Sequence, residues 1–192
     1  MTSSKIGNFF FKLRSYTPIP IILMMLYYAS PTGYSVSFGL LFIILGESIR
    51  IWAVGYAGGT TRATALGAAR DLVTTGPYSY VRNPLYLGNF ILSFGVCIIS
   101  NVLWVIPILT IGYFVQYLPI ISVEETYLSE SCGTVYESYY NNVPRLLPQL
   151  NPYPTSSSHD FSLKRALNSE KRTLTAILCV IGLLYVRQFI PI

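Results

Sequence analysis

Three short segments hold most of the side chains in this chain that could do chemistry. They are GPYSYVRNPLYLG at positions 76–88, EETYL at 124–128 and VPRLLP at 143–148. Arginine binds carboxylates and phosphates through paired hydrogen bonds, and tyrosine rings can pack on flat or cationic groups. A carboxylate can in turn bind an ammonium group. The three segments together therefore suit a zwitterionic ligand that also carries an aromatic group.

The rest of the chain is typical of a membrane protein. Only 11% of its residues are charged and 52% are hydrophobic, whereas soluble chains carry about 25% charged residues. Positions 15–46 and 83–123 contain no Asp, Glu, Lys or Arg, and each run is long enough for two spans of about 20 residues. Pro31–Gly33 and Ser100–Asn101 are the expected turns within them.

These runs predict an all-α fold, a polytopic membrane helix bundle with about five transmembrane helices and a cofactor pocket on the cytoplasmic side. We expect one domain over residues 1–192, with a core motif region at 72–148. A Ser-rich stretch that includes His159 favours a flexible linker over 149–170, and the last apolar segment predicts a terminal transmembrane helix over 172–190.

The basic residues predict the orientation of the chain in the membrane. Eleven of the 13 Lys and Arg residues fall in segments that share one side if the N-terminus is cytoplasmic. We therefore expect an integral, multi-pass protein of a prokaryotic cytoplasmic membrane, with the N-terminus and the active site on the cytoplasmic side. The basic residues are scattered at helix ends and form no run, so the bilayer is the expected partner and nucleic acid is not.

Cysteine and histidine usage argues against metal chemistry and against a histidine base. The three cysteines form no C-x-x-C pair and have no fixed spacing to His159, the single histidine. No metal site is therefore expected. The sequence also lacks a Walker loop and a strand-associated G-x-G-x-x-G segment.

The spacing of the polar segments predicts that they meet. Pro84 is favoured in the first turn of a helix, which places Arg82 and Asn83 at a positively polarised helix start where a carboxylate can bind. A helical hairpin over 83–123 would bring Glu124 and Glu125 back beside Arg82. For each residue alone, interface anchoring by Tyr or snorkelling by Arg or Glu remains an ordinary alternative.

The order of these segments resembles the integral membrane methyltransferases, the family that includes isoprenylcysteine carboxyl methyltransferases and phospholipid methyltransferases. The resemblance covers Leu72 to Pro148 and includes the family pattern R-H-P-x-Y-x-G, with Asn83 in place of the histidine. It implies an S-adenosylmethionine site on the cytoplasmic side and a lipid or lipidated acceptor that enters from the membrane.

The resemblance also implies roles for individual residues. The catalytic candidates are Arg82, Glu125 and Arg145. Glu125 would engage the cofactor or deprotonate an amine acceptor, and Arg145 would hold an anionic acceptor or, alternatively, anchor a lipid phosphate outside the site. The expected cofactor-binding residues are Gly76, Tyr78, Arg82, Asn83, Pro84, Tyr86, Gly88, Glu124, Glu125 and Leu128.

Several alternatives stay open at the level of sequence. Glu47 and Arg50 are three residues apart in an apolar run, so they can pair, either in an acceptor channel or in a salt bridge that fixes helix packing. The connection over 50–70 could close over the site. A membrane reductase of the sterol-reductase type, which would use NADPH, and a non-catalytic scaffold are the other function classes.

Overall fold

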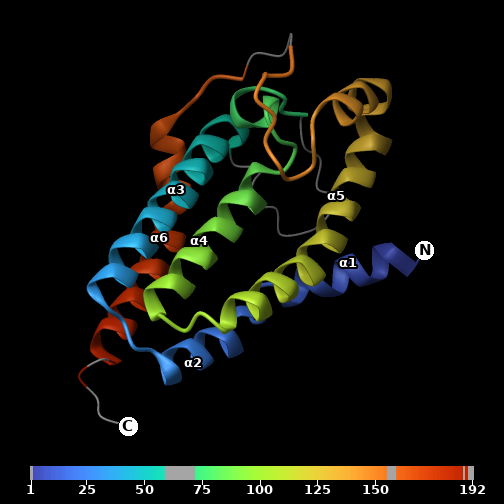
Figure 1. The fold of residues 1–192 in the computed structure, drawn as a ribbon. Helices are drawn as coiled ribbons and strands as arrows, with labels where there is room; N and C mark the ends of the chain where they lie inside the picture. Colours follow the sequence, from blue (N-terminus) through green and yellow to red (C-terminus); the bar gives the residue numbers. More distant parts are fainter. Residues whose placement is uncertain (1, 59–71, 155–158, 188, 190–192) are drawn as a thin grey trace.

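All regular elements that the structure describes are helical. The computed structural model describes residues 2–58, 72–154, 159–187 and 189. The elements are α1 (Thr2–Leu13), α2 (Pro18–Tyr28), α3 (Gly33–Ala57), the short 3-10 helix η2 (Gly76–Ser79), α4 (Pro84–Ser100), α5 (Val105–Asn142) and α6 (Leu163–Arg187) (Figure 1). This confirms the all-α fold class.

Local sequence signals set the helix ends at the expected turns. Thr32 caps α3, because its hydroxyl accepts a hydrogen bond from the Ser35 amide at 3.1 Å. Pro84 lies in the first turn of α4, and Asn101 ends α4 in the left-handed conformation with φ 58°. The Ser30 amide donates to the Ser100 carbonyl at 3.0 Å, so both turns meet at the end of the bundle opposite Pro84.

Fewer than five helices in the described residues qualify as candidate membrane spans. By length and composition, α3 and α5 can cross a membrane, and a third span exists if Lys5–Leu13 and Pro18–Tyr28, bent by 45°, count as one. The helix α4 is apolar but shorter. Two to three candidate spans in the described residues do not confirm the expected five.

The last helix begins earlier than expected, because its first turns are packed on α3. Residues 163–170, which belong to the expected linker over 149–170, are helical. Ala166 and Glu170 are buried there, and Glu170 pairs with Arg50 of α3. Most of the connection over 50–70 that could close over the site lies outside the described residues.

The helices α3 and α4 approach so closely that their backbones touch. A Cβ atom at Gly46 would lie 2.7 Å from the Gly88 carbonyl oxygen, and one at Gly95 would lie 2.7 Å from the Gly39 carbonyl oxygen. Each helix thus presents two glycines, seven residues apart, to its neighbour. Small residues at such a contact allow close packing, which drives helix association in lipid.

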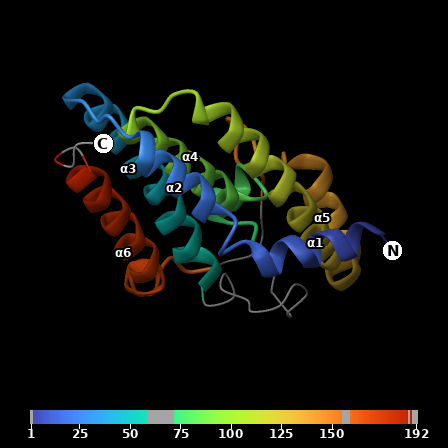
Figure 2. The same cartoon turned by 90° about the horizontal axis from the view of Figure 1, so that it is seen from below.

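The long helix α5 packs against a different neighbour from α4. Its largest contact is with α1, and it touches α4 less extensively. Figure 2 shows α6 on one side of the α3 and α4 pair, with α5 and α1 on the other. Pro119 lies inside α5, and Gly133 breaks its helical geometry with φ 54°.

Replacing Gly46 with Ala should destabilise the bundle. The new methyl group would meet the α4 backbone, which cannot move aside as a flexible side chain can, and overpacking of this kind costs about 1–3 kcal/mol. We expect a lower midpoint of thermal unfolding in detergent. Gly182→Ala is the matched control, since no atom lies within 4 Å of its added Cβ. Equal midpoints for the two variants would contradict the close α3–α4 contact.

Candidate active site

The carboxylate of Glu125 is the point at which the three polar segments meet. Arg82 donates from Nε to Glu125 Oε1 at 3.0 Å, and Asn83 donates from Nδ2 to the same oxygen at 3.2 Å. Arg145 donates to Glu125 Oε2. Glu125 is only 6% exposed. One buried carboxylate thus holds the start of α4, the middle of α5 and the segment after α5 together.

The hairpin of α4 and α5 explains why these groups meet. Pro84 begins α4, which runs to the turn at Asn101, and α5 returns to bring Glu125 beside the residues that precede Pro84. The start of α4 carries partial positive charge, which favours an anion. A carboxylate was expected at this helix start, and in the structure it is the protein's own Glu125.

The Arg82 guanidinium makes several contacts within the protein. Besides Glu125, it donates from Nη1 to the carbonyl oxygens of Tyr140 and Val143, both at 2.6 Å. Its Cζ lies 4.0 Å from the centroid of the Tyr140 ring, a cation–π contact. The Arg82 side chain is only 8% exposed. Arg82 therefore joins the end of α5 to the start of α4.

The segment that follows α5 lies along the motif of residues 76–88. The Gln149 amide donates to the Tyr80 carbonyl at 3.0 Å, and the Tyr153 amide donates to the Ser79 carbonyl at 2.9 Å. These main-chain bonds fix the first residues of the expected flexible linker. They also hold the backbone that carries Arg145 next to the cluster.

The Arg145 side chain is more accessible to a ligand than the Arg82 side chain. The Arg145 side chain is 35% exposed, against 8% for Arg82. The hydroxyl of Tyr86 donates to Glu124 Oε2 at 3.1 Å, which places a second carboxylate beside a tyrosine ring. The Tyr86 carbonyl in turn accepts a hydrogen bond from the Tyr113 hydroxyl at 2.6 Å. Charged and aromatic groups are therefore combined on one side of the Glu125 cluster.

Two glycines that were expected to shape the cofactor pocket lie at close packing contacts. Gly76 has φ 60°, and an added Cβ would lie 2.4 Å from the Tyr56 ring. Gly88 faces α3, where an added Cβ would lie 2.8 Å from the Gly46 carbonyl oxygen. Both positions therefore require a residue without a side chain, and their role in cofactor binding stays a prediction.

Tyr78 and Leu128 lie in a separate packed cluster beside the site. The Tyr78 carbonyl accepts a hydrogen bond from the Tyr139 hydroxyl at 2.7 Å. Leu128 packs against the cluster of Tyr136, Tyr139 and Val143. These residues support the backbone around Arg82.

A second ionic cluster is buried between α3, α4 and α6. Arg50 Nε lies 3.5 Å from Glu47 Oε2, which confirms that this pair forms. Arg50 also donates from Nε to Glu170 Oε2 at 3.1 Å and from Nη2 to Thr173 Oγ1 at 3.3 Å. Asn89 Oδ1 accepts from Arg50 Nη1. Arg50 therefore joins three helices, and removing one member would leave a buried charge unpaired.

Sequence reasoning missed several members of these clusters. The ring of Tyr140 contacts the Arg82 guanidinium. The only sequence signal for this contact was the spacing of Tyr136, Tyr139 and Tyr140, which places the three tyrosines at neighbouring positions of one helix. Glu170, the partner of Arg50, was assigned to the linker. Whether two residues so distant in sequence meet depends on which helix faces pack together. The local sequence gives little indication of that packing.

The Glu125 carboxylate has room for one further hydrogen-bond donor. Within the described residues, no group of three or more His, Cys, Asp or Glu side chains could hold a metal ion. Glu125 accepts from two arginines and an amide. A carboxylate has about four acceptor sites, so it can take one further donor, such as an ammonium group.

The sequence comparisons give several relatives. The chain is 27% identical over 121 residues to the nickel-cobalt-cadmium resistance protein NccN of Alcaligenes xylosoxydans xylosoxydans, covering 63% of this chain and 53% of that protein. It is 34% identical over 120 residues to the protein-S-isoprenylcysteine O-methyltransferase of Schizosaccharomyces pombe, covering 56% and 47%. It is 36% identical over 78 residues to the methanethiol S-methyltransferase of Crocosphaera subtropica, covering 37% and 27%.

The chain spans about half the length of the first two of these relatives. A family model described as phospholipid methyltransferase matches residues 34–134, more than half of the chain. The match includes Arg82 and Glu125 and ends before Arg145. The chain belongs to the phospholipid methyltransferase family.

Proposed function

We propose that this protein is a membrane-embedded methyltransferase that moves a methyl group from S-adenosylmethionine to a lipid or lipid-modified acceptor. The observation that carries the proposal is the convergence of Arg82, Asn83 and Arg145 on Glu125. Membership of the phospholipid methyltransferase family and the methyltransferase names of several relatives support it.

The residues around Glu125 fit the chemical groups of this cofactor. Glu124 and Glu125 would hold its ammonium group, and the ring of Tyr86 would face its sulfonium or its adenine. Asn83 would complete the site where the family has a histidine, since an amide keeps both a donor and an acceptor. When bound, the cofactor supplies an electrophilic methyl group for in-line displacement.

The chain's own contribution is to position the reactants and exclude water. Arg82 and Glu125 fix the start of α4 against α5, so that groups on both helices keep one geometry. The buried ion pair of Arg82 and Glu125 is poorly accessible to water, which strengthens its electrostatic effect on a bound ligand. An anionic acceptor needs no general base, whereas an amine acceptor would need one.

We propose a lipid head group as the acceptor, with a prenylcysteine carboxylate and a lipid phosphate as the other members of the class. Arg145 would hold the anionic group, because it is the cluster's partly exposed cation and can form two hydrogen bonds to a carboxylate or phosphate. The names of the relatives include both an isoprenylcysteine and a methanethiol methyltransferase. The same proposal places the protein in the membrane as a multi-pass chain with the Glu125 cluster on the cytoplasmic side.

Glu125→Gln should weaken binding of S-adenosylhomocysteine by about 10- to 100-fold, because hydrogen bonds to charged groups contribute about 1.5–3 kcal/mol. The variant keeps the side-chain shape but removes the charge that pairs with Arg82 and Arg145. Calorimetric titration in detergent with added lipid would measure the affinity, with NADPH as a second ligand.

The matched control for this experiment is Glu130→Gln, an exposed carboxylate on the same helix, which should bind with native affinity. Arg82→Lys tests the same site if Glu125→Gln fails to fold. Native affinity in a folded Glu125→Gln or Arg82→Lys variant would place the cofactor elsewhere. Binding of NADPH alone would assign the protein to the reductase class.

Arg145→Ala should separate acceptor binding from cofactor binding. We expect the KM for a carboxylate-bearing acceptor, with N-acetyl-S-farnesylcysteine as the probe, to rise at least 10-fold. The affinity for S-adenosylhomocysteine should change by less than about threefold, which corresponds to under 1 kcal/mol. The reverse pattern, a weakened cofactor and an unchanged acceptor KM, would overturn the acceptor role of Arg145.

A further inference from the structure

The first half of α6 carries a dense group of basic side chains. Its exposed basic residues, here called the basic face, are Lys164, Arg165, Lys171 and Arg172. The positions that follow, 173–186, contain no Asp, Glu, Lys or Arg. Basic residues directly before an apolar helical stretch are typical of a segment at the cytoplasmic surface of a membrane.

The basic face lies on the side of α6 that does not pack on the protein. Its members recur at intervals of seven residues, which is close to two full turns. The buried residues of α6 recur at intervals of four and seven, and they are Ala166, Glu170, Ile177 and Leu184. Arg172 follows Glu170 by two positions, which corresponds to about 200° around the helix. One side of α6 is therefore packed, and the other presents the basic face.

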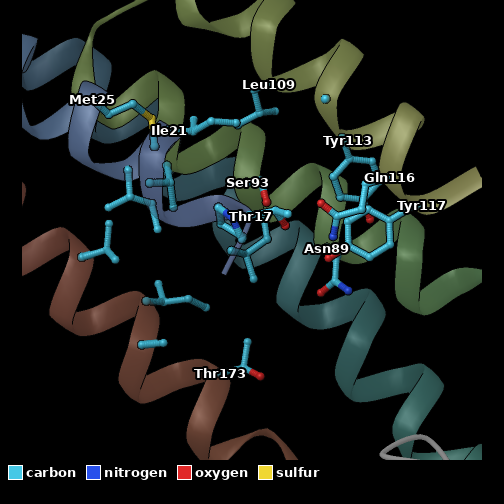
Figure 3. A pocket seen from close by; sticks show the side chains of 18 of the residues that line it. Thr17, Ile21, Met25, Asn89, Ser93, Leu109, Tyr113, Gln116, Tyr117 and Thr173 are labelled. Atoms are coloured by element: carbon cyan, nitrogen blue, oxygen red, sulfur yellow. The ribbon is translucent and has the colours of Figure 1, made fainter. Parts of the chain in front are cut away.

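Contacts on the packed side fix the rotation of α6. Glu170 pairs with Arg50 of α3, and Thr173 Oγ1 accepts a hydrogen bond from Arg50 Nη2 at 3.3 Å. Thr173 and Ile177 also line a cavity of about 480 Å³ between α2, α4, α5 and α6 (Figure 3). The basic face therefore cannot turn inward without breaking these contacts.

The basic face is not neutralised by the part of the protein that the structure describes. There, no carboxylate lies within 4.0 Å of its four cations, whereas Arg50, Arg82 and Arg145 each have one. Asp160 and Glu170 are the acidic residues nearest to it in the sequence. Glu170 pairs with Arg50 on the packed side. An anion from outside the chain can therefore approach all four cations.

The basic face lies beside the end of a candidate membrane span. The helix α3 can cross a membrane by its length and composition, and Gly58 is its C-cap. A Cβ atom at Gly58 would lie 2.9 Å from Arg165 Nη1, and the Ser162 amide donates to the Gly55 carbonyl at 3.1 Å. Trp52, which is 41% exposed near this end of α3, is of a type enriched at the membrane–water boundary. The basic face is thus at the level of the lipid head groups.

We infer that the basic face of α6 binds the phosphate groups of anionic phospholipids at the membrane surface. The inference rests on the membrane placement given under the proposed function and does not depend on methyl transfer. Arg165 and Arg172 can each hold a phosphate through two hydrogen bonds, and the two lysines add positive charge. A zwitterionic phospholipid carries its own cation, so the basic face should favour lipids with a net negative charge.

The test is titration of the full chain, in a non-ionic detergent, with phosphatidylglycerol or with phosphatidylcholine of the same acyl chains. Native mass spectrometry measures the bound lipid. We expect the first phosphatidylglycerol to bind at least about 10-fold more tightly than phosphatidylcholine. Lys171→Gln/Arg172→Gln should weaken its binding about 25-fold, because each basic residue near an anionic surface contributes about fivefold, or about 1 kcal/mol. Both side chains are exposed, so the variant should fold.

Lys5→Gln/Lys12→Gln is the matched control. It removes the same number of charges from exposed positions of α1, which lies on the other side of the α3 and α4 pair from α6 (Figure 2). The affinity for phosphatidylglycerol should change by less than about threefold, because salt screens exposed charges beyond about 10 Å. Lys171→Arg/Arg172→Lys keeps both charges and should bind phosphatidylglycerol as the wild type does.

Two results would overturn the inference. One is equal affinity of the folded wild type for the two lipids. The other is an equal loss in the two charge-removing variants, which would assign the attraction to the net charge of the protein. Binding of S-adenosylhomocysteine is measured on the same samples, so the two proposals can fail separately. Selective lipid binding without cofactor binding contradicts the proposed function alone, and the reverse pattern contradicts the basic-face inference alone.

Discussion

The ionised carboxylate of Glu125 is the interaction on which the rest of the site depends. A buried carboxylate is costly unless it is paired, and here Arg82, Asn83 and Arg145 all donate to it. Arg82 extends this network to the end of α5, because it also donates hydrogen bonds to two carbonyl oxygens there. Polar groups from segments far apart in sequence therefore occupy one place, although the surrounding chain is largely apolar.

Different packing on the two sides of α4 makes room for the cavity. Glycines allow α3 to touch the α4 backbone, as the short approach at Gly46 and Gly88 shows. On the other side, rings separate α4 from α5, including Phe90 and Tyr113 with centroids 5.1 Å apart. The aromatic residues also connect the cavity to the Glu125 cluster, since the Tyr113 hydroxyl binds the Tyr86 carbonyl.

Sequence reasoning succeeded where a local signal controls the structure. Proline favours a first helical turn, which located the start of α4 at Pro84, and the hairpin then implied that Glu125 returns to Arg82. It was less informative where tertiary packing decides. The side of α4 that Gly88 faces and the pairing of Glu170 with Arg50 depend on neighbouring helices. Hydropathy alone likewise gave five spans, of which helix length and composition in the described residues support two to three.

The most direct test of the central claim is an experimental structure of the protein with S-adenosylhomocysteine bound in a lipid environment. The account predicts that the ligand's amino group contacts Glu124 or Glu125 while Arg82 keeps its contact with Glu125. A ligand bound away from Glu125, or a Glu125 carboxylate separated from Arg82 and Arg145, would contradict it.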